Sequence, residues 1–278
     1  PQFWSRGTLN VDSMFVRGIQ LTELQGPIWI DSTRVALGRR VPAVDRQQPS
    51  QMLSARVYEG KVEADLEMTL GEFAEFNTQL RLENANVSTL SRDLRLGNGN
   101  LSGQATAALN LRGSSRGQHT FNGSGNLRLR NANMYELPIV LAILSRIGSG
   151  NADNTAFNSS DVEYRIRDGY VYFNQFDLSG DAITLKGIGE MSLDRELNLD
   201  FYSLVGNEGL WSPLVRPFLG EASRQFLQIH VDGTLDAPVT RQEVLPGLNE
   251  TLQQLFPELM TPTPPANNTS RRFLPRWK

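Results

Sequence analysis

The chain has 278 residues, a formal net charge of −3 and no cysteine. The lack of cysteine excludes a disulfide scaffold and a thiolate zinc site, and the slightly acidic balance leaves no basic footprint for nucleic acid. The longest apolar run, 139–144, is far shorter than the roughly 20 apolar residues of a membrane-spanning helix. Pro1 stands at the start and no charged-then-apolar leader follows, so we expect a piece of a longer protein.

The first 48 residues predict strands that form an upstream β repeat. Leu9, Val11 and Phe15 alternate with polar residues, and short apolar runs follow at 28–30 and 35–37. The stretch 43–51 is mostly polar and contains Pro49, which predicts a loop or linker. We therefore expect a boundary near residue 48 and a main β region spanning 49–236.

Two segments of the β region resemble each other. Residues 80–90 (LRLENANVSTL) and 127–137 (LRLRNANMYEL) are identical at seven of eleven positions, at an offset of 47 residues. A repeat at a fixed offset favours stacked β units, each ending in the same Asn-Ala-Asn turn. It therefore predicts an elongated sheet in preference to a closed globule.

One short helix is predicted near 138–147. Pro138 suits the first helical position, the run 139–144 is apolar on nearly all sides, and Gly148 follows Ile147. We interpret this helix as a plug over one end of the apolar face of the sheet. Contact with a lipid or a membrane surface is the alternative.

The densest alternation of apolar and polar residues lies between 161 and 205, where Asp168-Gly169 and Ser179-Gly180-Asp181 separate the runs. This pattern predicts an antiparallel meander with one apolar and one polar face. The expected fold class is mainly β: an elongated, curved, groove-like antiparallel sheet of repeated units with a few short helices. The side chains predicted to line the apolar groove are Val162, Tyr164, Ile166, Val171, Phe173, Ile183, Leu185, Met191, Leu193, Leu197, Leu199 and Phe201.

The C-terminal part is predicted to leave the sheet. A last strand ends at Gly233, and the leucines at 245, 248, 252 and 255 follow helical spacing. We therefore expect a linker and an amphipathic helix in 237–260. The proline-rich, polar segment 261–278 is predicted to be disordered.

Candidates for catalysis or metal binding are few. The only histidines are His119 and His230, and neither belongs to a catalytic or zinc-binding motif. Acidic residues such as Asp168 and Asp194 stand at turns, which they stabilise through local hydrogen bonds. The sequence predicts a protein that is not an enzyme, with no catalytic residue, no metal site and no cofactor, while a carboxylate pair converging from distant positions is an alternative.

The ordered combination of these elements resembles the C-terminal region of AsmA-like proteins, within the AsmA/TamB-type lipid-conduit superfamily. The resemblance covers about 101–238. It depends on the Gly-rich strand pair 101–125, the Asn-Ala-Asn turn, the Leu-Pro helix, the segments 157–169 and 178–189, Leu197-Asn198-Leu199, and VDGTLDAP at 231–238.

The resemblance implies a periplasmic protein, anchored in the inner membrane of a diderm bacterium by an N-terminal helix absent from this chain. It implies phospholipid or other acyl lipids as ligands of the apolar groove, and a role in phospholipid transport and outer-membrane biogenesis. It is also compatible with an outer-membrane or envelope protein as partner, while the acidic net charge predicts no nucleic acid partner. The expected geometry agrees, because a seven-residue strand of about 23 Å exceeds the roughly 15 Å acyl region of one leaflet.

Two other hypotheses stay open. In the first, the same apolar side chains meet a covering layer, and the protein is a β-rich envelope scaffold or interaction module with a closed core. In the second, it is an envelope hydrolase, which requires a cluster of carboxylates or histidines in a cleft.

Overall fold

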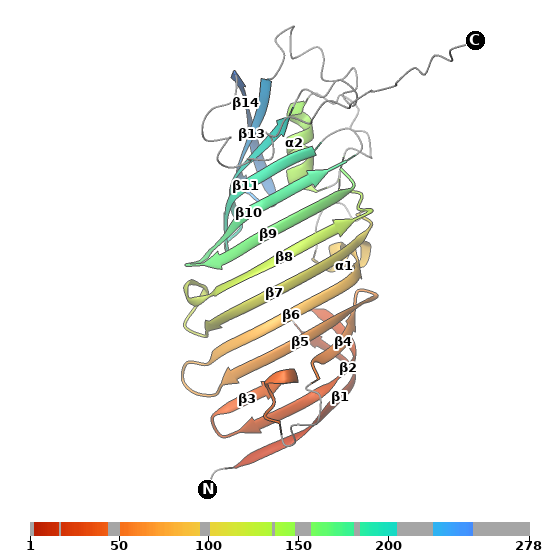
Figure 1. Ribbon diagram of the computed structural model, residues 1–278, viewed down its shortest axis with the longest axis vertical. Coiled ribbons are helices and arrows are strands. Elements are labelled where there is room, and N and C mark those ends of the chain that lie inside the picture. Colours follow the sequence, from red (N-terminus) through yellow and green to blue (C-terminus); the bar gives the residue numbers. More distant parts are fainter. Residues whose placement is uncertain are drawn as a thin grey trace, which may run out of the picture.

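The computed structural model describes residues 3–16, 18–43, 51–94, 101–134, 137–147, 157–180, 184–204 and 225–246. Within these residues, one antiparallel sheet of 14 strands dominates the structure, accompanied by two short α-helices (Figure 1). The predicted mainly β fold is confirmed. Among the described residues, no helix combines the length and the apolar character that crossing a membrane requires.

The strands follow one another in the sheet almost in sequence order, as expected of a meander. They are β1 (Trp4–Val16), β2 (Ile19–Asp31), β3 (Arg34–Leu37), β4 (Leu53–Val57), β5 (Gly60–Thr69), β6 (Glu75–Asn86), β7 (Gln104–Ser114), β8 (Asn122–Arg130), β9 (Ser159–Arg167), β10 (Tyr170–Ser179), β11 (Thr184–Ser192), β12 (Glu196–Leu204), β13 (Gln225–Thr234) and β14 (Ala237–Pro246). The helices are α1 (Val87–Leu94) and α2 (Pro138–Ile147), with 3₁₀ turns η1 (Gly38–Arg40) and η2 (Gln118–Thr120).

β3 and β4 lie end to end and share one position in the sheet. Both pair with β2 on one side and with β5 on the other. Between them the chain leaves the ladder after Leu37, and Asp65 of β5 holds the excursion by accepting hydrogen bonds from the backbone N–H and the Nε of Arg39, both at 2.7 Å. The sheet therefore continues across the boundary that was predicted near residue 48.

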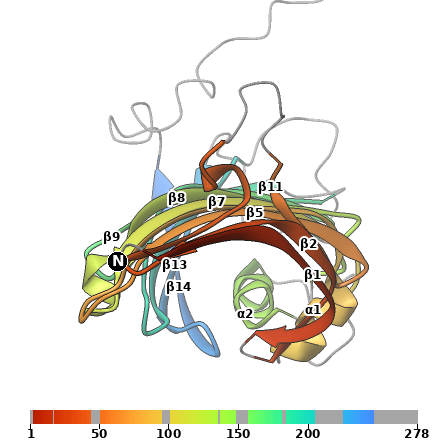
Figure 2. The ribbon, with the colours of Figure 1, turned by 90° about the horizontal axis from the view of Figure 1, so that it is seen from below.

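The sheet is bent into an arch, and both α-helices lie on its concave side (Figure 2). Glycines opposite aromatic residues allow this bend. A Cβ on Gly187 would lie 2.5 Å from the Phe201 ring, and a Cβ on Gly125 would lie 2.5 Å from Tyr164 Oη. The rings of Phe201 and Tyr164 therefore lie directly over glycines, and the missing side chains leave room for neighbouring strands to bend toward each other.

The predicted repeat has a structural basis in the backbone. Asn84 and Asn131, 47 residues apart, both adopt left-handed conformations, with φ of 52° and 50°, which asparagine tolerates better than most residues. The alanine that follows each of them is buried, and α1 begins directly after the first Asn-Ala-Asn turn. α1 was not predicted; its signal is Asn86, whose Oδ1 accepts a hydrogen bond from Ser88 N at 2.9 Å as an N-cap.

The C-terminal expectation was wrong for residues 237–246, which form strand β14 and no linker. Thr234 pairs with Ala237 across a two-residue turn, so Pro238 sits at a position whose nitrogen faces away from β13. An edge strand tolerates proline there because no ladder hydrogen bond is lost. The remainder of the expected helix and the tail lie outside the described residues. The helix predicted at 138–147 is present as α2.

Candidate functional site

The register of the sheet aligns side chains into three rows on its concave face, each member paired directly with the next on the neighbouring strand. The first row is Ile28, Leu37, Leu66, Thr78, Leu111, Gly123, Ile166, Val171, Met191 and Leu197. The second row is Ala64, Leu80, Leu109, Gly125, Tyr164, Phe173, Gly189, Leu199 and Val231. The third row is Val62, Leu82, Ala107, Leu127, Val162, Phe176, Gly187, Phe201 and Ile229. The concave face is thus apolar from β2 to β13.

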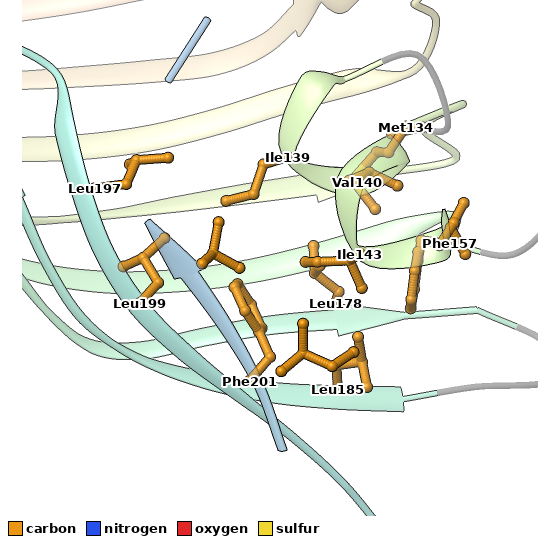
Figure 3. Packing of buried hydrophobic residues seen from close by; sticks show 14 residues of the cluster. Met134, Ile139, Val140, Ile143, Phe157, Leu178, Leu185, Leu197, Leu199 and Phe201 are labelled. Carbon is orange, nitrogen blue, oxygen red and sulfur yellow. The ribbon is translucent and has the colours of Figure 1, made fainter. Parts of the chain in front are cut away.

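At the C-terminal end, α2 covers these rows. Its side chains at 139, 140, 143 and 144 share one helix face and are at most 5% exposed. Figure 3 shows this face packed toward Leu178, Leu185 and Phe201. Thr240 of β14 also donates a hydrogen bond from Oγ1 to the carbonyl oxygen of Ala142, at 3.2 Å. The helix and the strands β10–β13 therefore form a closed hydrophobic core.

From β2 to β8, the same rows are only partly covered. Leu80 of the second row is 37% exposed and Ile30, next to the first row on β2, is 38% exposed. The other large apolar members of the first and second rows on these strands are partly exposed. Among the described residues, α1 and Leu101 cover only the margin of the face, where Val87 and Leu101 form a small cluster with Leu82 and Leu127 of the third row.

Ten of the twelve residues predicted to line the groove lie on this concave face, as their register shows. Leu185, Leu197, Leu199 and Phe201 belong to the core beneath α2, where none is more than 6% exposed. Val162, Ile166 and Val171 are buried, at 6–9% exposure, while Tyr164, Phe173 and Met191 are partly exposed.

The other two predicted groove residues differ. Leu193 lies in the turn between β11 and β12, where its N–H donates to the carbonyl of Gly169 at 2.9 Å, so it borders the face and does not line it. Ile183 lies outside the described residues.

Sequence reasoning missed the exposed part of the face. Its members on β5, β6 and β7 include Leu66, Leu80, Leu109 and Leu111. Each alternates with polar residues in the same way as the predicted set, as in Leu80-Arg81-Leu82 and Leu109-Asn110-Leu111. The signal was therefore present in the sequence, but the alternation is densest between 161 and 205, and the predicted lining residues all come from that stretch.

The convex face carries the charged side chains. Asp161 accepts hydrogen bonds from Arg128 Nε at 2.7 Å and from Arg130 Nη2 at 2.7 Å. Burial raises the pKa of Asp161, but these two guanidinium groups outweigh it and hold the pKa below its ordinary value. This face suits contact with water.

His230 lies between two carboxylates, on the convex side of the part of the sheet that α2 covers. Its Nδ1 lies 2.9 Å from Asp200 Oδ1 and its Nε2 lies 2.6 Å from Asp232 Oδ1, and Arg241 pairs with Asp232. Burial lowers the pKa of His230, but the hydrogen bonds and charges of the two carboxylates outweigh it and the pKa is raised. Both ring nitrogens are engaged, so neither is available as a general base in this arrangement.

Other chemistry is sparse in the described part of the chain. His119 is exposed in the turn η2. Within the same residues, no group of three or more histidine and acidic side chains is arranged to hold a metal ion. Comparison of the chain with protein-family models, with curated proteins and with solved structures gives no match. The concave face is therefore the feature on which a function can be argued.

Proposed function

We propose that the protein binds the acyl chains of lipids along the concave face, on the first and second rows between β2 and β9. The observation that carries this proposal is the partial exposure of aligned apolar side chains there, exemplified by Leu80 at 37%. Such a face leaves contiguous apolar surface in contact with water, and this exposure costs free energy unless a ligand or partner covers the surface.

The dimensions support acyl chains as the ligand. From β2 to β9 there are six inter-strand steps, which at about 4.8 Å each span about 29 Å. One leaflet's acyl region is about 15 Å deep, so this face is long enough for a fatty acyl chain laid across the strands. Binding would be non-directional at roughly 25 cal/mol per Å² of apolar surface, which suits mixed lipids.

The covered region sets a limit to the lipid path. Beneath α2, the row members Leu197, Leu199 and Phe201 contact protein and are at most 6% exposed, so they leave almost no surface for a ligand. Acyl chains would therefore occupy the face on the N-terminal side of α2. Headgroups would project past the strand ends into water.

The cellular setting of the proposal comes from the resemblance to AsmA-like proteins. In this proposal the protein lies in the periplasm of a diderm bacterium and is anchored to the inner membrane by an N-terminal helix that is not part of this sequence. There it would assist phospholipid transport and outer-membrane biogenesis, with an envelope protein as partner and without catalysis or a cofactor.

The test compares variants that add one negative charge to the concave face with a variant that adds it to the convex face. Leu80→Glu and Leu109→Glu place a carboxylate on the concave face, and Asn110→Glu places the same charge on the exposed convex face beside them. We expect the two concave variants to lose most of the binding of a fluorescent fatty acid and most of the co-purified lipid detected by mass spectrometry, while Asn110→Glu keeps both. Equal binding by all three folded variants would contradict the proposal.

The alternative function is a β-rich scaffold or interaction module with a closed core. The core beneath α2 favours it for β10–β13, where side chains interlock as in an ordinary domain. It predicts that delipidated wild-type protein takes up no fatty acid at all, because a packed core leaves no room for the chain.

A further inference from the structure

A pocket of about 340 Å³ lies on the convex face, where β8, β9 and β10 are neighbours in the sheet. The polar side chains that line it are those of Asn122, Arg165, Arg167, Tyr172 and Asn174. Arg165 stands between Tyr164 and Ile166, whose side chains belong to the concave rows, so its own side chain points to the opposite face. The strands and turns that border the pocket all fall within the described residues 101–134 and 157–180.

The charge of this pocket distinguishes it from two other pockets of the described sheet. One of them, of about 530 Å³, contains Glu67 and Glu75 beside Arg112 and Arg116. The other, of about 350 Å³, contains three glutamates beside an arginine and a lysine. The pocket between β8 and β10 is lined by two arginines and by no carboxylate. Its uncompensated positive charge therefore favours an anion.

The guanidinium group of Arg165 is available to a ligand. Its side chain is exposed, and no ion pair or hydrogen bond engages the guanidinium group within the described residues. The residues that face it across the two ladders are Ser124 on β8 and Tyr172 on β10, and neither is acidic. Glu163 is the nearest acidic residue on the same side of β9, and no ion pair joins it to Arg165.

Arg167 is oriented by an aromatic ring. Its guanidinium carbon lies 5.8 Å from the centroid of the Tyr172 ring, within the range of a cation–π contact. Its Nε pairs with Asp168 at 3.2 Å, but both side chains are exposed, at 66% and 75%, and such pairs contribute little. The two terminal nitrogens are directed away from that pair. Alternate residues of a strand are about 7 Å apart, so both guanidinium groups can reach one ligand.

The donors of this pocket suit a phosphate group better than a carboxylate. A single arginine fork occupies both oxygens of a carboxylate, whereas a phosphate group presents more oxygens and can accept hydrogen bonds from two forks. The side-chain amides of Asn122 and Asn174 and the hydroxyl of Tyr172 supply further donors around the same space. The pocket therefore combines two charged forks with three neutral donors.

We propose that this pocket binds a phosphate group between the guanidinium groups of Arg165 and Arg167. The chemistry is that of a phosphate ester, which either a small soluble molecule or the headgroup of a phospholipid can supply. The site lies on the opposite face of the sheet from the apolar rows. It therefore does not depend on the binding of acyl chains there.

Calorimetry with glycerol phosphate tests the site on the 278-residue chain at constant ionic strength. We expect binding that inorganic phosphate competes for and that acetate does not. Arg165→Gln and Arg167→Gln should each raise the dissociation constant about tenfold, and the double variant should abolish measurable binding. Arg165→Lys/Arg167→Lys keeps both charges but loses the planar forks, so it should still bind several-fold more weakly than the wild type.

The matched control removes the same charge elsewhere on the convex face. Arg56 and Arg81 are exposed there, on β4 and β6. Arg56→Gln/Arg81→Gln should change the dissociation constant by less than about twofold, because distant exposed charges are screened. Circular dichroism checks that every variant is folded.

Vesicles of phosphatidylglycerol distinguish the two sources of the phosphate group. If the ligand is a headgroup, the wild-type protein co-sediments with these vesicles and Arg165→Gln/Arg167→Gln does not. If the ligand is a free ester, only glycerol phosphate binds. Either result supports the site. Failure of the wild type to bind both probes, equal competition by acetate and phosphate, or an equal loss in Arg56→Gln/Arg81→Gln would overturn the proposal.

Discussion

The two ends of the concave face carry the same pattern of side chains in different surroundings. Around β10–β13, the rows pack against α2 and most of their large side chains are buried, while from β2 to β8 the same rows are partly exposed. The strands alone therefore do not decide whether the face is a core or a binding surface. That decision belongs to a ten-residue helix inserted between β8 and β9.

The sharpest way to test this contrast is to truncate one side chain in each region. Phe201→Ala removes a fully buried ring, and we expect a loss of about 3–5 kcal/mol in the free energy of unfolding because the closed core cannot collapse into the space. Leu80→Ala should cost less than about 1 kcal/mol, since its side chain is already partly in water. Urea unfolding of both variants measures the difference, and equal losses would contradict the comparison.

On the convex side of β5, in the part of the sheet that α2 does not cover, Asp65 stabilises the fold. Asp65 is 2% exposed and holds both the backbone and the guanidinium of Arg39. Asp65→Ala leaves the backbone N–H of Arg39 unpaired, and we expect a loss of about 2–3 kcal/mol. Arg39→Lys, which keeps the charge and the backbone hydrogen bond, provides the matched comparison and should lose clearly less in the same unfolding assay.

A smaller effect is expected at the glycines that permit the bend. Gly187→Ala places a methyl group against the Phe201 ring, and we expect a destabilisation of about 1–2 kcal/mol from overpacking. Gly71→Ala, where nothing lies within 4 Å, is the control and should be near neutral. Thermal unfolding midpoints distinguish the two, and a neutral Gly187→Ala would mean that the closed end tolerates extra volume.

The smallest effect concerns the convex side of the covered region and depends on pH. The pKa of His230 is raised above its ordinary 6.5 in the folded protein. Its contribution to stability is therefore fully present below the unfolded pKa and is lost as the pH rises through the raised value. Because the group is partly exposed, we expect no more than about 1 kcal/mol.

The measurement is the difference in unfolding free energy between about pH 6 and about pH 9. Wild-type protein should lose stability over this interval by more than His230→Gln does. His119→Gln, at the exposed histidine, should behave as wild type. A smaller loss of unfolding free energy in the wild-type protein than in His230→Gln would show that Asp200 and Asp232 do not stabilise the charged imidazole.

Much of the fold could be predicted from periodicity alone. Alternation at Tyr164 and Ile166 indicated the correct face, and Pro138 indicated the start of α2. Which strands the helix covers could not be predicted, because that depends on the bend of the sheet and on contacts such as Thr240 with Ala142, 98 residues apart. β14 was missed because Pro238 resembles the end of a strand until its outward position is known.

The position in the sheet that β3 and β4 share offers a practical site for labelling the protein. After Leu37 the chain departs from the ladder at η1, on the side where Asp65 accepts hydrogen bonds from Arg39, opposite to the apolar rows. Lengthening a loop costs only about 0.6 kcal/mol for each doubling. An epitope or fluorescent reporter inserted directly after η1 would start on the convex side of the arch and would leave the concave face unobstructed.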